Sequence, residues 1–197
     1  MNWNEKISDL QGLLNGMEAT DASGALLSHE EAFARWYALA CELQTNRRML
    51  YFVGNGASAS MACHFSADIG KNARIHTQVF TDPSLVTAMA NDISYQEAFA
   101  TPLRLWGQEG DLLIAISSSG KSPNILAAVA AAKEVGITSV TLSAMGPDNP
   151  LRRAGDLNFY VAARTYGNAE TCHATILHHW VDALMGEVAV LAGPAGK

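Results

Sequence analysis

Short apolar runs alternate with longer amphipathic stretches along most of this chain. Five runs have the length and composition of buried strands: 49–53, 77–80, 112–116, 138–142 and 157–161. The stretches between them place apolar residues at helical spacing, so strand and helix alternate. This βαβ alternation is typical of a parallel sheet with helices on both faces. We therefore predict an α/β fold, a three-layer αβα sandwich around a central parallel five-stranded sheet.

Residues 1–47 are predicted to form a helical lead-in to this core. Ser28 and Glu31 have the spacing of a capping box, and an amphipathic helix over 29–47 follows them. This helix carries an aromatic stripe that includes Trp36. We expect the stripe to pack against the sheet or against a second subunit.

Two later helices complete the pattern. The clearest covers 124–135 and runs from a polar start to Gly136, a residue suited to ending a helix. The last, from about 169 to 191, is apolar enough to be largely buried. Because no linker or internal repeat divides the chain, we expect one domain, residues 1–197, with these parts: the lead-in 1–47, the αβα core 48–191 and a tail, 192–197.

Composition narrows the class of protein. The chain has 197 residues, of which 49% are apolar and 16% charged, enough to bury a core. Its formal net charge of -6 argues against nucleic-acid binding, which needs a basic face. No apolar run reaches the roughly 18 residues of a membrane-spanning helix, so no membrane association is expected. The three cysteines form no even framework and the N-terminus does not resemble a signal peptide, which favours a reduced, cytoplasmic compartment.

Two loops that follow predicted strands are rich in Gly and Ser. The first covers 54–58 and the second 117–122, and each precedes a helix. In open parallel sheets, ligands bind outside the carboxyl ends of the strands. Glycines allow close backbone approach, hydroxyls donate hydrogen bonds, and the helix N-terminus attracts anions. We interpret the two loops as one phosphate site, with these candidates: Asn55, Gly56, Ser58, Ser117, Ser118, Ser119 and Ser122.

Two nucleotide-binding motifs are incomplete at these loops. The stretch 54–59 lacks the third glycine of a dinucleotide fingerprint, and Phe80 stands where an acidic residue would end the next strand. Residues 120–122 reproduce the end of a Walker A loop, but Ala115 occupies the position of its first glycine. The sequence therefore disfavours both a Rossmann cofactor and a nucleoside triphosphate.

Titratable residues lie close to both loops. His64 and Asp68 share one face of the helix after the first loop, either as a site or as an exposed ion pair. The last helix adds Glu170, His173 and His178. Glu170 and His178 are eight residues apart, about 12 Å along an ideal helix, so one metal ion would strain to reach both. Glu170 and His173 have a spacing that suits a ligand pair better, and the residues alone leave these alternatives open.

Asp92 has two interpretations. It follows a helix-like stretch and precedes Tyr95, where another helix is expected to begin. Asp92 either caps that helix or binds sugar hydroxyls.

Three motifs and the histidine-bearing last helix together resemble the sugar isomerase (SIS) domain family. The motifs are GNGASASMACHFSADI, ANDISYQEAF and GDLLIAISSSGKSPNI, and the resemblance spans about residues 28–190. It is strongest to members that interconvert sedoheptulose 7-phosphate and D-glycero-D-manno-heptose 7-phosphate in nucleotide-activated heptose biosynthesis. The resemblance implies a flavodoxin-like αβα sandwich and an aldose–ketose isomerase.

The resemblance also implies roles for individual residues. Asp68 and His178 would act as acid and base, in either order, on an enediol. Zn²⁺, one per subunit, would be bound by His64, Asp68, Glu170 and His178, which overrules the spacing argument. The phosphosugar would contact the two loops together with Asp92 and Glu170. A homotetramer with its sites at subunit interfaces is implied as well.

Several positions depart from the family pattern. The family has aspartate where Met61 stands, two glutamates in place of Ala67 and Asp68, and glutamine in place of Glu170; it also has an aspartate near Gly167. Some sugar contacts are therefore absent. Two alternatives follow: an isomerase of another phosphosugar, or a non-catalytic SIS-domain scaffold or sensor.

Overall fold

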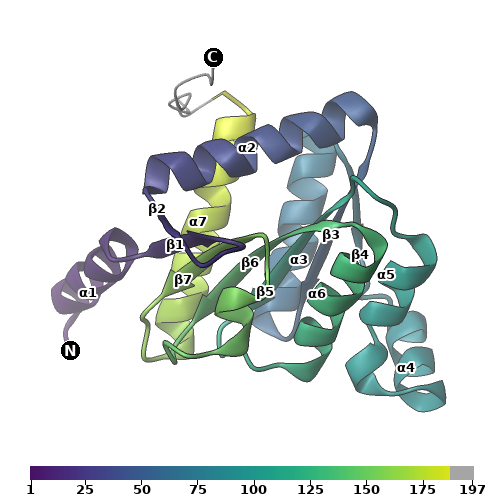
Figure 1. The fold of residues 1–197 in the computed structure, drawn as a ribbon. Coiled ribbons are helices and arrows are strands. Elements are labelled where there is room, and N and C mark those ends of the chain that lie inside the picture. Colours follow the sequence, from purple (N-terminus) through teal and green to yellow (C-terminus); the bar gives the residue numbers. More distant parts are fainter. Residues whose placement is uncertain (187–197) are drawn as a thin grey trace.

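The five predicted strands are present, parallel and adjacent. The computed structural model describes residues 1–186. Each strand lies within one residue of its predicted ends or extends at most two residues beyond them: β3 (Met49–Gly54), β4 (His76–Val79), β5 (Leu112–Ser117), β6 (Thr138–Ala144) and β7 (Leu157–Val161). Their order in the sheet is β7-β6-β5-β3-β4, with parallel pairing throughout. The predicted α/β sandwich is confirmed (Figure 1).

Two strands that the sequence did not predict enlarge the sheet to seven. β1 (Glu18–Asp21) pairs antiparallel with β7 and with β2 (Leu26–Leu27). The hairpin turn is closed by the Asp21 carboxylate, which accepts hydrogen bonds from the backbone N–H of Ser23 and Ala25 at 2.9 and 3.0 Å. Strands of four and two residues are too short for an alternating pattern, and pairing with β7 stabilises them. The prediction of five strands was therefore two short.

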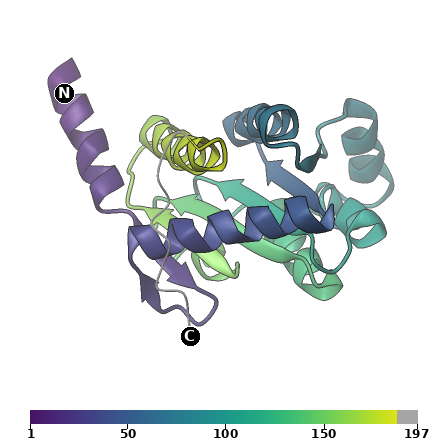
Figure 2. The ribbon, with the colours of Figure 1, turned by 90° about the horizontal axis from the view of Figure 1, so that it is seen from above.

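The described residues form seven α-helices: α1 (Trp3–Asn15), α2 (His29–Asn46), α3 (Ala57–Asp68), α4 (Pro83–Asp92), α5 (Ala100–Trp106), α6 (Pro123–Val135) and α7 (Tyr166–Leu184). Buried side chains of α2, α3 and α7 form the core on one face of the sheet, and those of α5 and α6 form the core on the other. Figures 1 and 2 show α1 projecting at one end of the molecule and α4 lying at the opposite end. No helix among residues 1–186 is long and apolar enough to cross a membrane.

The observed ends of α2 and α7 differ from the predicted ones, whereas the end of α6 agrees. Ser28 caps α2 as expected, but Glu31 bonds Arg35 instead of completing the capping box. The last helix begins at Tyr166 and ends at Leu184, so the predicted range 169–191 was wrong at both ends; 187–191 and the predicted tail 192–197 lie outside the described residues. α6 ends as predicted at Gly136, which adopts a left-handed conformation with φ 82.

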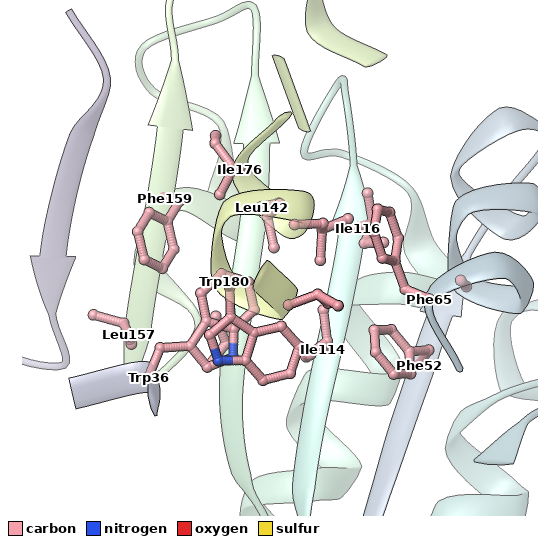
Figure 3. Packing of buried hydrophobic residues seen from close by; sticks show 14 of the residues in the cluster. Trp36, Phe52, Phe65, Ile114, Ile116, Leu142, Leu157, Phe159, Ile176 and Trp180 are labelled. Atoms are coloured by element: carbon pink, nitrogen blue, oxygen red, sulfur yellow. The ribbon is translucent and has the colours of Figure 1, made fainter. Parts of the chain in front are cut away.

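The aromatic stripe of α2 is part of the core on the α7 side. Trp36 stacks on Trp180 of α7, with ring centroids 4.4 Å apart and an interplanar angle of 12°. It also packs against Phe159 of β7 at 5.1 Å (Figure 3). Both tryptophans are fully buried. Of the two predicted partners for this stripe, Trp36 therefore contacts the sheet and α7 of its own chain.

Candidate functional site

The two Gly- and Ser-rich loops meet at the carboxyl ends of neighbouring strands. β3 and β5 pair directly, with Gly54 opposite Ile116 at the end of the register. A cavity of about 280 Å³ opens there, and α7 contributes one wall. Its lining consists of Asn55, Gly56, Ala57, Ser58, Ile116, Ser117, Ser118, Ser119, Ser122, Tyr166 and Glu170. The structure thus brings together all seven loop residues predicted to bind phosphate.

The first loop needs glycine for close packing against the start of α3. A Cβ on Gly54 would lie 2.6 Å from the backbone carbon and oxygen of Ser58. Gly56 precedes α3 with φ 56, and no side chain caps the helix there. The N-terminal end of α3 therefore faces the cavity with the donors and positive dipole that attract an anion.

The serine loop is held by its own hydroxyls. The Ser117 hydroxyl accepts a hydrogen bond from Gly120 N–H and lies 3.2 Å from the Ser122 hydroxyl. The Ser119 hydroxyl accepts from the N–H of Lys121 at 3.3 Å. Gly120 has φ 62, and a Cβ there would collide with the buried Asn149 side chain. The loop is consequently a fixed array of neutral donors.

The charges around this cavity are unusual for an anion site. None of the described lining residues is Lys or Arg, so hydroxyl and N–H groups would carry phosphate binding. Glu170, one turn into α7, places a carboxyl group on the wall. His173, one turn further along, is fully buried and neither ring nitrogen has a hydrogen-bond partner. The alternative of a Glu170–His173 ligand pair therefore has no support, because His173 lies in the core.

A pair of imidazoles lies on exposed parts of α3 and α7. The ring centroids of His64 and His178 are 5.7 Å apart. The ring of Phe65 packs edge-on against His178 at 4.7 Å, which restricts the orientation of that imidazole. Both histidines are exposed. The structure thus joins two residues that the sequence singled out on separate helices.

The other two predicted metal ligands are not part of this pair. Asp68 lies one turn beyond His64 and accepts a hydrogen bond from Asn72 Nδ2 at 3.2 Å. Glu170 faces the cavity, about 12 Å along α7 from His178. Within residues 1–186, no three or more His, Cys, Asp or Glu side chains are arranged to hold a metal ion. The four-residue ligand set therefore does not assemble within this single chain.

Asp92 does not cap the helix that was expected near Tyr95. It is the last residue of α4, it accepts a hydrogen bond from Asn91 Nδ2 at 2.8 Å, and it does not line the cavity. The helix expected near Tyr95 is one 3₁₀ turn, η2 (Tyr95–Glu97), and Ser94 caps it. The capping interpretation of Asp92 was therefore wrong.

Sequence reasoning missed two polar residues beside the cavity, Tyr95 and Asn124. Both hydrogen-bond to Asn55 of the first loop. Asn124 is 2% exposed at the start of an otherwise apolar helix. An amide residue at the start of such an apolar segment was the signal in the sequence that could have identified Asn124, because a buried amide needs a hydrogen-bond partner.

Comparison with known families decides the class of protein. Residues 25–144 match the model of the SIS domain. The chain belongs to the SIS domain family. A phosphoheptose isomerase from Halorhodospira halophila is 35% identical over 167 residues, which cover 81% of this chain and 83% of the relative. Another, from Shewanella denitrificans, is 38% identical over 133 residues, with coverage of 64% and 68%.

Solved structures agree with this assignment. The phosphoheptose isomerase of Neisseria gonorrhoeae superimposes on this SIS-domain chain with a TM-score of 0.72 and 27% identity, covering 79% of this chain and 86% of that one. The enzyme from Francisella tularensis gives a TM-score of 0.75 at 24% identity, with coverage of 94% and 100%, and supports the fold alone. The chain is thus an isomerase of the SIS domain family.

Proposed function

We propose that this SIS-domain isomerase interconverts sedoheptulose 7-phosphate and D-glycero-D-manno-heptose 7-phosphate through an enediol. The reaction would be a step in the biosynthesis of nucleotide-activated heptose. The observation that carries the proposal is the placement of two polar sites on the same pair of helices. The donor-lined cavity lies at the start of α3 and α7, and the His64–His178 pair lies further along both.

The separation of the two sites suits a sugar phosphate bound at one end. His64 is six residues beyond Ser58, about 9 Å along α3, and His178 is about 12 Å beyond Glu170 along α7. Eight bonds join phosphorus to C1 in an open-chain heptose 7-phosphate. At about 3.5 Å per three bonds of extended chain, they span about 9 Å. A heptose held by its phosphate would therefore place C1 and C2 near the two histidines.

The chemistry requires two proton transfers. One group moves a proton between C1 and C2, and one moves a proton between the two oxygens. We assign these roles to Asp68 and His178, with His64 beside His178 as a further polar neighbour. The cavity donors would hold the phosphate still while the far end of the sugar reacts.

The implied zinc ion fits this chain only in part. His64 and His178 would supply two imidazole ligands, whereas Asp68 and Glu170 would have to approach them from elsewhere on α3 and α7. When bound, zinc would polarise the sugar oxygens.

A homotetramer with sites at subunit interfaces is also part of the proposal. His64, His178 and the neighbouring His179 are exposed in the single chain. Proton transfer to an enediol benefits from exclusion of water, and a second copy of the chain would cover these residues. Size-exclusion chromatography with light scattering tests this: a tetramer mass supports it, and a monomer at micromolar concentration contradicts it.

Proton exchange with solvent tests the activity itself. We expect the purified protein to incorporate deuterium at C1 of sedoheptulose 7-phosphate, or at C2 of the aldose product, in deuterated water, as followed by NMR. A His178→Ala variant is the matched negative control, because it leaves the phosphate cavity intact. Exchange with a different phosphosugar alone would identify another substrate. If no phosphosugar undergoes exchange, the enzymatic function is contradicted, and a non-catalytic scaffold or sensor becomes the better interpretation.

A further inference from the structure

Three side chains from separate segments form a closed hydrogen-bond network beside the phosphate cavity. Asn55 Nδ2 donates to Asn124 Oδ1 at 2.9 Å, and Asn124 Nδ2 donates back to Asn55 Oδ1 at 2.9 Å. The Tyr95 hydroxyl donates to the same Asn55 oxygen at 3.0 Å. The network therefore connects the loop after β3, the first turn of α6, and η2.

The network uses most of the hydrogen-bonding capacity of Asn55. An amide oxygen has two lone pairs, and here both are occupied, by Tyr95 and by Asn124. One of the two amide hydrogens is bound to Asn124. Asn55 lines the cavity, so one N–H remains available to a ligand there. Asn55 can consequently act on a ligand only as a donor.

Both partners of Asn55 are themselves held in place. Asn124 is buried in the first turn of α6, whose backbone fixes its position. Tyr95 lies on η2, where Glu97 accepts a hydrogen bond from Arg104 Nη1 at 2.7 Å. Arg104 Nε also contacts Glu134 of α6 at 2.7 Å. The turn that carries Tyr95 is therefore connected to α5 and α6 through Arg104.

We propose that Asn124 and Tyr95 are positioning residues that fix the Asn55 amide as a single hydrogen-bond donor to the phosphosugar. This inference rests on the proposed function for the identity of the ligand. The donor favours ligand oxygens that only accept, such as those of a phosphate. Since Tyr95 is 53% exposed and its ring is not part of the core, removing its hydroxyl changes the orientation of Asn55 with little effect on the fold.

Tyr95→Phe is the sharpest test, because it removes one oxygen atom. We expect its KM for sedoheptulose 7-phosphate to rise at least threefold while kcat stays within twofold, since the lost interaction concerns binding and not the reacting carbons. Asn124→Ala, which frees both ends of the Asn55 amide, should raise KM at least tenfold. Tyr51→Phe is the matched control: it removes a tyrosine hydrogen bond of 3.2 Å, to the Trp106 carbonyl, without touching Asn55.

Inorganic phosphate provides a second readout that does not depend on catalysis. Its dissociation constant, measured by calorimetry, should rise in Tyr95→Phe and stay at the wild-type value in Tyr51→Phe. A Tyr95→Phe protein with wild-type KM and wild-type phosphate affinity would overturn the inference, as would equal weakening in both tyrosine variants. If the wild-type protein binds phosphate but isomerises no heptose, the proposed substrate fails while the phosphate comparison still decides the role of Tyr95.

Discussion

The imidazole rings of His64 on α3 and His178 on α7 lie side by side, with centroids 5.7 Å apart and an interplanar angle of 60°. Imidazole nitrogens are common ligands of metal ions and exchange protons near neutral pH, so two neighbouring histidines form a candidate site for either. The two helices thus meet twice, at the cavity that their first turns line and at this pair of histidines.

The histidine pair predicts a specific loss of zinc. We expect zinc in the purified protein to fall to background in His64→Ala and in His178→Ala, as measured by elemental analysis, because each change removes one of two neighbouring nitrogen ligands. His178→Ala should also lower kcat by about 10²–10⁴-fold, the usual contribution of a general acid or base. His76→Ala, which removes an exposed histidine on β4, is the control and should retain zinc. Wild-type protein without zinc would refute the metal part of the proposal.

The Trp36–Trp180 stack predicts an unequal response to two substitutions. Trp36→Ala opens a large cavity and should lower the free energy of unfolding by about 3–5 kcal/mol. Trp36→Phe keeps most of the ring contact and removes an indole N–H that is buried without a partner. Its cost should be below about 1.5 kcal/mol, because the lost volume is partly offset by removal of the unpaired donor. Urea denaturation measures both, and equal losses would contradict this account.

The serine loop predicts strong sensitivity at Gly120. Gly120→Ala should destabilise the protein by at least about 1–2 kcal/mol, the cost of left-handed backbone for a residue with a Cβ. The collision with Asn149 adds to this cost, because Asn149 is fixed by hydrogen bonds to the carbonyls of Ala144 and Gly146. Gly146→Ala, where a Cβ meets no atom within 4 Å, serves as the control and should be close to neutral in thermal unfolding. A neutral Gly120→Ala would show that the loop is not held as described.

Burial of His173 predicts a dependence of stability on pH. Burial lowers the pKa of His173 from 6.5 to about 4 in the folded protein. Between these values the unfolded chain binds a proton that the folded chain does not, so the free energy of unfolding falls as pH drops from 6.5 to 4. At about 1.4 kcal/mol per unit of pKa shift, the total loss is about 3 kcal/mol. His173→Leu should reduce this slope in denaturant titrations at pH 7, 6 and 5, and identical slopes would contradict the prediction.

Local patterns were sufficient to predict the parallel sheet and the meeting of the two Gly- and Ser-rich loops at one cavity. Strands buried on both faces are rich in apolar residues, so β3 and β5 were visible as continuous runs. The carboxyl ends of parallel strands share one edge, so two Gly- and Ser-rich loops after such strands had to lie together. The hairpin of β1 and β2 was not predicted, because its stability comes from pairing with β7, which is distant in sequence.

The surroundings of the α7 side chains could not be predicted from the sequence. The sequence placed Glu170, His173 and His178 on one helix. Spacing favoured Glu170 and His173 as a pair, whereas the family resemblance joined Glu170 to His178. In the tertiary structure Glu170 lines the cavity, His173 is enclosed by the core, and His178 meets His64. Helical periodicity assigns residues to faces, but which element covers each face depends on packing between distant segments.

The sequence by itself determined the five parallel strands, most of the helices and the two polar loops that follow neighbouring strands, because each of these depends on neighbouring residues. Only the tertiary structure decided which histidines are buried or exposed. It also placed the Asn55–Asn124–Tyr95 network at the cavity and kept Asp68 and Glu170 apart from the histidine pair. These contacts join segments that are distant in sequence, so no local pattern predicts them. The packing of α3, α6 and α7 on one sheet sets the distances between their side chains.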